Sequence, residues 1–127
     1  MAYADLGDRL LEYGVRIIKL VEALPGTVAC RTIGAQLLRS GIAVGANYEE
    51  AQAAESKADF VHKLQIALKE MRESNYWLRL LTKSGKFAPD RLAEITDESN
   101  QLRAMLSKAV VRAKGRQHEP SLAAPNF

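Results

Sequence analysis

The sequence is poor in the residues that build disulfide-bonded, zinc-binding or membrane proteins. Its one cysteine, Cys30, excludes an intramolecular disulfide framework and a cysteine-cluster metal site. Its two histidines, His62 and His118, are too far apart in sequence for a common zinc motif. No run of about 18 apolar residues is present, so we expect no membrane span and no membrane partner. The first ten residues carry two aspartates and no apolar stretch. We therefore expect no signal peptide and a cytoplasmic protein.

Aromatic residues and proline are also scarce, and this scarcity favours helices over strands. Aromatic residues make up 6% of the 127 residues and there are only 4 prolines, whereas hydrophobic residues as a group reach 47%. Aliphatic, proline-poor segments suit helices better than sheets, which are enriched in aromatic and β-branched residues. The length is that of one domain.

Three local signals divide the chain into four helical segments. Pro25-Gly26 is the first break, and Ser56 followed by Asp59 is the signature of a helix N-terminal cap before an apolar run. Pro89 suits the first turn of a new helix after a glycine-containing break. We predict helices at about 5–24, 29–54, 57–83 and 89–114, forming one domain over 1–114. The Gly, Pro and polar content of residues 115–127 predicts a C-terminal tail.

Apolar or small residues recur every three or four positions in each segment, as in helices of a bundle. We call each such row of residues a seam. The seam of the first segment consists of Leu6, Leu10, Tyr13, Ile17, Val21 and Leu24, and the seam of the second consists of Ile33, Leu37, Ser40, Val44, Asn47 and Ala51. The seam of the third segment consists of Phe60, Leu64, Ala67, Met71, Ser74, Leu78 and Leu81, and the seam of the fourth consists of Leu92, Ile95, Ser99, Leu102, Leu106, Ala109 and Ala113. Gly34, Gly41 and Gly45 beside the second seam predict a closely packed neighbour. With short connections, this pattern predicts an all-α, antiparallel up-down-up-down four-helix bundle.

Some apolar residues lie off these seams and need another explanation. They are Leu11, Val15 and Ile18 on the first segment and Val61, Leu68, Tyr76 and Trp77 on the third. All of them except Val61 and Leu68 are candidates for an interface. One interpretation is a wide core face with a few exposed apolar side chains, which is ordinary. The other, which we favour, is an interface between copies of the chain in a homo-oligomer.

A search for chemistry finds no catalytic constellation. Gly41 and Gly45 lack the strand and the Lys-Ser/Thr context of a phosphate-binding loop, so helix packing explains them better. No glutamate is followed by a histidine at the third position, which argues against the di-metal sites that some bundles hold. We interpret Asn47 and Glu50 as groups that hydrogen-bond neighbouring backbone or an arginine and fix helix register. We therefore expect no enzyme activity, no cofactor and no metal.

Charge is the remaining signal. The net charge is +3, and the basic run from Arg103 to His118 lies at a pole of the predicted bundle where acidic residues balance it. At the opposite pole, six basic residues face only Glu22 and Asp90. A basic rim of this kind suits phosphate contacts with nucleic acid, and an ordinary solvated surface is the alternative. The six candidate residues are Lys19, Arg31, Arg79, Lys83, Lys86 and Arg91.

The stretch from residue 36 to residue 51 resembles the signature of the four-helix-bundle proteins encoded in intervening sequences of 23S ribosomal RNA genes. The positions that match are Gln36, Arg39, Ser40, Asn47 and Glu50. The runs 59–70 and 73–81 also look like this family, and the resemblance spans about residues 5–112. Leu38, Ala43 and Ala51 depart from the signature; Leu38 stands where the family often has an arginine, which weakens a nucleic-acid role at that position.

The resemblance implies a four-helix bundle that assembles as a homopentamer and has no assigned enzymatic activity. A related branch, the accessory proteins of diversity-generating retroelements, binds nucleic acid and a reverse transcriptase. Three hypotheses follow. The first, which we favour, is a homo-oligomeric adaptor that binds RNA or DNA through phosphate contacts. The second is a protein-interaction scaffold that uses the extra apolar residues or the tail and has no nucleic-acid affinity. The third, and the weakest, is an enzyme.

Overall fold

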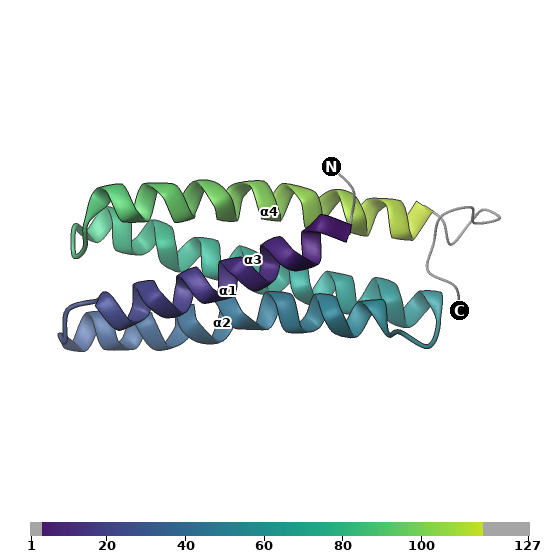
Figure 1. Cartoon of the computed structure of the whole chain (residues 1–127), viewed down its shortest axis with the longest axis horizontal. Coiled ribbons are helices and arrows are strands. Elements are labelled where there is room, and N and C mark those ends of the chain that lie inside the picture. Colours follow the sequence, from purple (N-terminus) through teal and green to yellow (C-terminus); the bar gives the residue numbers. More distant parts are fainter. Residues whose placement is uncertain (1–3, 116–127) are drawn as a thin grey trace.

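Four helices form the part of the chain that the computed structural model describes, residues 4–115. They are α1 (Ala4–Ala23), α2 (Val28–Gln52), α3 (Lys57–Ser84) and α4 (Pro89–Gly115). Consecutive helices run in opposite directions and are joined by short corners (Figure 1). This arrangement confirms the predicted all-α four-helix bundle. Most of the predicted tail lies outside the described residues.

Short polar signals begin and end the helices where the sequence places them. The Thr27 hydroxyl accepts a hydrogen bond from the Cys30 amide at 3.1 Å, and the Ser56 hydroxyl accepts one from the Asp59 amide at 3.1 Å. Each satisfies an amide that has no partner within its own helix. After α3, Gly85 adopts a left-handed conformation with φ 68°, which costs glycine little because it has no Cβ.

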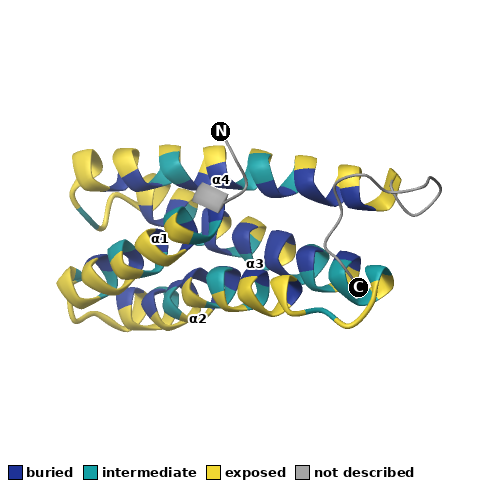
Figure 2. Cartoon of the chain, turned by 45° about the vertical axis from the view of Figure 1, so that its right-hand side comes forward, coloured by how far each residue is buried: buried dark blue, intermediate teal, exposed yellow. Residues whose placement is uncertain are grey.

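The core lies along the predicted seams. Leu6, Leu10, Tyr13 and Ile17 of α1 are buried, as is every predicted seam residue of α4. Figure 2 shows the buried parts of the helices on the inner sides of the bundle and the exposed parts on the outer sides. Seam residues near the helix ends, namely Val21, Leu24, Ile33 and Phe60, are only half-buried, because the bundle is open to solvent there.

The packing order gives the bundle four sides. α2 packs on α1 and on α3, α3 packs on α4, and α1 closes on α4 through the least extensive of these contacts. α1 is also the shortest helix and crosses obliquely, so that it begins part-way along the bundle (Figure 1). In this order the side formed by α1 and α2 is opposite the side formed by α3 and α4. We call them the α1–α2 face and the α3–α4 face.

Small residues on α2 allow α1 to approach closely, as predicted. A Cβ on Gly41 would lie 2.9 Å from both Cγ atoms of Ile17, closer than real contacts allow, whereas one on Gly45 would lie 3.6 Å from the backbone of Leu10. Gly41 is thus required by the α1–α2 contact, because any side chain there would push the helices apart.

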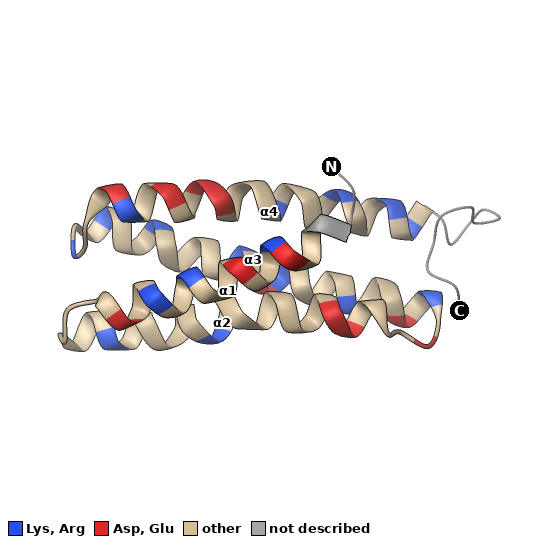
Figure 3. Ribbon diagram, viewed as in Figure 1, with Lys and Arg blue, Asp and Glu red and all other residues tan. Residues whose placement is uncertain are grey.

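Acidic residues gather on the first half of α4 (Figure 3), and the one in the first turn, Asp90, complements the positive end of the helix dipole. They are Asp90, Glu94, Asp97 and Glu98. Glu98 forms an ion pair with Arg9 of α1, with Oε1 2.7 Å from Nη2, and this pair closes α1 on α4. None of the four described helices is long and apolar enough to cross a membrane.

Candidate functional site

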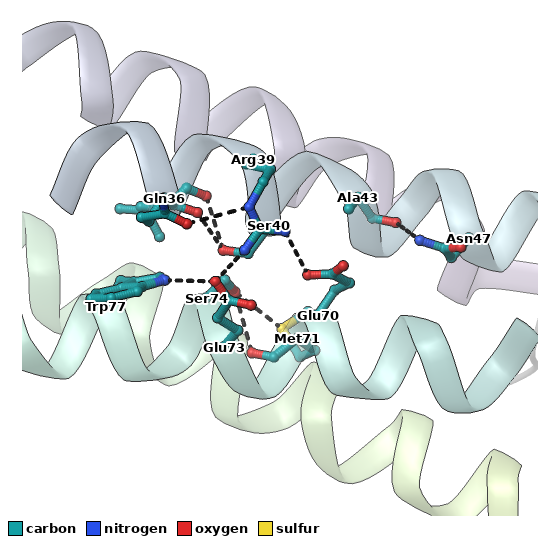
Figure 4. A network of polar contacts seen from close by, with 11 residues as sticks. Gln36, Arg39, Ser40, Ala43, Asn47, Glu70, Met71, Glu73, Ser74 and Trp77 are labelled. Carbon is teal, nitrogen blue, oxygen red and sulfur yellow. Dashed lines mark hydrogen bonds and ion pairs between the residues drawn. The ribbon is translucent and has the colours of Figure 1, made fainter. Parts of the chain in front are cut away.

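Two residues of the sequence signature on α2, Arg39 and Glu50, form ion pairs with α3. The Arg39 guanidinium forms ion pairs with Glu73 and, at 3.2 Å between Nη1 and Oε1, with Glu70. The Trp77 indole donates to Glu73 Oε2 at 3.1 Å (Figure 4). The hydrogen bond from Arg39 lowers the pKa of Glu73, and the same contact raises the pKa of Arg39. Arg39 is therefore occupied by two carboxylates.

The other signature residues also make contacts within the chain. The Ser40 hydroxyl donates to the Gln36 carbonyl at 2.8 Å, and the Asn47 amide donates to the Ala43 carbonyl at 2.9 Å (Figure 4). Glu50 pairs with Lys63 of α3 at 3.6 Å between Oε1 and Nζ. Asn47 thus bonds to neighbouring backbone, as interpreted from the sequence, whereas the partner of Glu50 is a lysine and not an arginine. The signature thus holds α2 and its contact with α3.

The sequence analysis did not predict a buried polar network that lies at the centre of the bundle. Asn75 is fully buried and donates to Ser99 Oγ at 2.6 Å and to Asn100 Oδ1 at 2.9 Å. Its own Oδ1 accepts from Arg79 Nε at 3.0 Å, so the network reaches the surface. Ser99 lies on the predicted seam of the fourth segment, but periodicity alone assigns Asn75, beside the seam of the third, to the surface.

Tyr13 of α1 joins the same centre. Its hydroxyl lies 2.6 Å from Ser74 Oγ. Burial raises the pKa of Tyr13 to about 12, although the hydrogen bonds with Ser74 and Ser99 act in the opposite direction. The hydroxyl therefore stays protonated at any physiological pH.

The six basic candidates do not converge on one site within the chain. Arg79 and Lys83 share a groove of about 530 Å³ on the α3–α4 face. Lys19 and Arg91 line a separate pocket of about 150 Å³ between α1 and α4. The remaining two are at the corners: Arg31 donates to the Gly26 carbonyl, and Lys86 is exposed in the α3–α4 connection.

Two acidic residues reduce the charge excess expected at this pole. Glu94 lines the pocket of Lys19 and Arg91, and Asp97 lines the groove of Arg79 and Lys83. Arg16 also lines the pocket of Lys19 and Arg91, so that including all three residues lowers the net charge from the +4 of the sequence count to +3. Both acidic residues lie about one to two turns into α4, beyond the corner to which the sequence count was confined.

A second basic groove lies further along the α3–α4 face. It has a volume of about 420 Å³, and no acidic residue lines it. Its basic lining residues are Lys69, Arg72 and Lys114. The sequence analysis missed it because it counted charges by pole. The available signal was the spacing of Lys69, Arg72, Arg79 and Lys83 at helical intervals.

The opposite, α1–α2 face carries an apolar groove of about 320 Å³. Leu11 is 69% exposed and Ile18 41%, and Val15 and Ile42 lie beside them. Tyr76 and Trp77, the other predicted interface residues, belong to α3 and lie away from this groove. Tyr76 is in the α3–α4 groove, and Trp77 is half-buried against the core.

Among residues 6–115, no group of three or more His, Cys, Asp or Glu side chains is placed to hold a metal ion. Cys30 is buried at the start of α2.

The fold and these contacts define an antiparallel four-helix bundle whose middle helices are tied by ion pairs and whose opposite faces differ in chemistry. The chain belongs to the 23S rRNA-intervening sequence protein family, whose model matches residues 8–108. It is similar to a solved protein of unknown function from the S23 ribosomal protein family of Bacteroides thetaiotaomicron VPI-5482. The two share 36% sequence identity over 83% of this chain and 97% of that one, with a TM-score of 0.75. No curated protein matches the chain.

Proposed function

We propose that the protein is a non-enzymatic, homo-oligomeric adaptor that binds nucleic acid through phosphate contacts. One observation carries the proposal: the two grooves of the α3–α4 face are lined by five basic residues and one acidic residue, Asp97. The basic residues are Lys69, Arg72, Arg79, Lys83 and Lys114. A field of one sign along one face attracts a polyanion.

These basic groups are also available for an external partner. Within the described part of the chain, Lys69, Arg72 and Lys83 are exposed and take part in none of the ion pairs. Arg9 and Arg39 are different, because carboxylates already neutralise both. Phosphate contacts therefore fall on the α3–α4 face rather than on the signature residues of α2.

The α1–α2 face supports the oligomeric part of the proposal, with a second copy of the chain as its occupant. Gly14 lies in the middle of α1 and lines the apolar groove, and a Cβ there would meet nothing within 4 Å. An interior glycine costs a helix about 1 kcal/mol relative to alanine, and no contact within the chain requires it. A neighbouring copy that packs closely over Leu11 and Ile18 explains both the glycine and the exposed apolar side chains.

The family resemblance suggests five copies. A five-fold ring needs a heterologous contact, in which the groove of one copy meets a different surface of the next. We propose a ring that leaves the α3–α4 faces accessible, each of them a phosphate-binding surface. An adaptor of this kind meets its nucleic acid in the cytoplasm.

Light scattering of the purified protein, with and without a short structured RNA and at low and high salt, tests both parts. We expect a mass near five copies of the 14.0 kDa chain, RNA bound at low salt and RNA released at high salt. Charge reversal of Arg79→Glu with Lys83→Glu should abolish binding without changing the mass. The matched control, Lys19→Glu with Arg91→Glu, should bind RNA with an affinity closer to that of the wild type.

A multimer that does not bind RNA at any salt concentration would contradict the nucleic-acid proposal and favour a protein-interaction scaffold. If the Arg79→Glu, Lys83→Glu variant changes mass, the α3–α4 face is instead an interface between copies.

A further inference from the structure

Four basic residues and one tyrosine follow each other along a single stripe of α3. Steps of three and four residues separate them, so they share one side of the helix, and all five are exposed. The stripe runs for about 21 Å at the helical rise per residue. Its members, in order, are Lys69, Arg72, Tyr76, Arg79 and Lys83.

Tyr76 lies where the stripe passes the larger groove. Its side chain is 48% exposed and lines the groove together with Arg79 and Lys83 of α3 and Asn100 of α4. The hydroxyl of Thr96, also in the lining, is buried and has no hydrogen-bond partner among the described residues. A buried hydroxyl without a partner is costly, and a polar group entering the groove would satisfy it.

Arg79, the cation beside the Tyr76 ring, is held in place by a buried residue of the bundle. Arg79 Nε donates to the buried Asn75 at 3.0 Å, and its guanidinium carbon lies 5.8 Å from the centroid of the Tyr76 ring. The Trp77 ring meets the Tyr76 ring edge to face, with the centroids 5.1 Å apart. Both neighbours limit the movement of Tyr76, which leaves a preorganised flat surface at the mouth of the groove.

Basic residues interleaved with an exposed aromatic ring are the pattern that proteins use for unpaired nucleotides. The cations contact phosphates, and the ring stacks on a base. A duplex offers no such base, because its bases are paired and stacked inside the helix.

We propose that this stripe is a track for single-stranded nucleic acid, with Tyr76 stacking on one base in the groove and Lys69, Arg72, Arg79 and Lys83 contacting the flanking phosphates. This inference rests on the proposed function and narrows it from nucleic acid in general to an unpaired strand.

Fluorescence anisotropy with fluorescein-labelled twelve-nucleotide oligo(rU), oligo(dT) and a twelve-base-pair duplex tests the track on the full chain. We expect tighter binding of a single strand than of the duplex. Tyr76→Leu should weaken that binding about tenfold or more, whereas the matched control Tyr76→Phe keeps the ring and should change it little. Unlabelled oligo(rU) should also quench the fluorescence of Trp77, the only tryptophan, and Tyr76→Leu should reduce this quenching.

The charge part of the track has its own measurement. Lys69→Gln with Arg72→Gln should lower the salt dependence of single-strand binding, by about 0.7 in the log–log slope for each phosphate that the variant no longer neutralises. Lys19→Gln, on the α1–α4 side, is the matched control and should leave the slope unchanged.

The outcomes separate the inference from the function on which it rests. Wild-type protein that binds the duplex better, or binds single strands equally well after Tyr76→Leu, overturns the track and leaves phosphate binding standing. Wild-type protein that binds none of the three probes overturns both. Light scattering of Tyr76→Leu provides a further check: loss of the assembled mass would make Tyr76 an interface residue between copies and would also overturn the track. A difference between oligo(rU) and oligo(dT) identifies which nucleic acid the track accepts.

Discussion

The α1–α2 face and the α3–α4 face are built from the same kind of helix and differ in both their inner and outer sides. On the inner side, α1 and α2 meet through a glycine, with Ile17 packed over Gly41. Between α3 and α4, the apolar core also contains the hydrogen bonds of the buried Asn75. On the outer side, the first face presents an apolar groove and the second presents basic grooves.

The proposed function divides two tasks between these two faces. Apolar contact over a glycine-lined surface is short-ranged and suits a fixed partner of matching shape. Exposed cations act at longer range, are screened by salt and tolerate many partners of opposite charge. The proposed function gives assembly to the α1–α2 face and nucleic-acid binding to the α3–α4 face, and four predictions test the contacts on which this comparison depends.

The largest effect is expected from charge placed in the apolar groove. Leu11→Glu with Ile18→Glu should dissociate the assembly to single chains, because an unpaired carboxylate in an apolar interface is strongly unfavourable. Light scattering measures the mass, and far-ultraviolet circular dichroism should show unchanged helix content, since both side chains point to solvent within the chain. Val28→Glu, at a residue that is 72% exposed and outside the groove, is the control. An unchanged mass in the double variant would remove the assembly role from this face.

The second largest effect is expected on the stability of the chain, from a substitution on the inner side of the α1–α2 face. Gly41→Ala should lower the free energy of unfolding by about 2 kcal/mol, because its Cβ overlaps Ile17 and the two helices must shift. Gly45→Ala is the matched control: its Cβ makes an ordinary contact with Leu10, so the higher helix propensity of alanine should leave stability equal or improved. Urea unfolding at one fixed protein concentration compares them. Equal stability of the two variants would show that α1 is not held tightly against α2.

A smaller effect, about 1 kcal/mol at neutral pH, is expected for Tyr13→Phe, which removes the hydroxyl bonded to Ser74. Its pH dependence is more specific. Above pH 10.0, the ordinary pKa of tyrosine, the unfolded state loses the proton while the folded state keeps it up to about pH 12. The unfolded state then binds fewer protons, so wild-type stability falls as the pH rises through this range, by up to about 3 kcal/mol.

Urea unfolding of wild type and Tyr13→Phe at pH 8 and pH 11 measures this contribution. The phenylalanine variant should lose less stability between the two values, since it has no proton to lose at this position. Equal losses in both proteins would mean that Tyr13 ionises as readily in the folded chain as in the unfolded one.

The smallest effect is expected at the exposed ion pairs between α2 and α3, which lie between the two faces. Glu73→Gln should reduce stability slightly at pH 7. Because Arg39 lowers the pKa of Glu73, the stabilisation is present above the ordinary value of 4.5 and is lost as the pH falls through the lower folded-state value. The difference between wild type and variant should therefore shrink at pH 3. Glu22→Gln, at an exposed glutamate without an ion pair in the described part of the chain, is the control and should change stability little at pH 7.

The helices and the core could be predicted from the sequence, because both depend on residues that are close together in the chain. Ser56 and Thr27 cap amides within three residues, and the recurrence of apolar residues at three and four positions assigns each helix one inner side. For the same reason Leu11, Val15 and Ile18 could be recognised as surplus to the core. The sequence missed Leu20 and Tyr48, which are also buried, because a single seam is narrower than the side that a helix buries.

The candidate site was only partly predictable. Arg79 and Lys83 were among the basic candidates, but Lys69, Arg72 and Lys114 were not, and Lys19 and Arg91 proved to face Glu94 on another side. The role of Arg39 as a link to Glu70 and Glu73 depends on residues more than thirty positions away.

The sequence by itself thus determined where the helices begin and end, which side of each is apolar, and that they form an antiparallel bundle, since these depend on neighbours within a few residues. Only the tertiary structure decided which charges are neutralised, which remain exposed together, and which faces are opposite each other. Charge pairing and groove shape depend on how far apart two helices lie and how they are rotated, and that geometry is set by contacts such as Gly41 with Ile17 between distant parts of the chain.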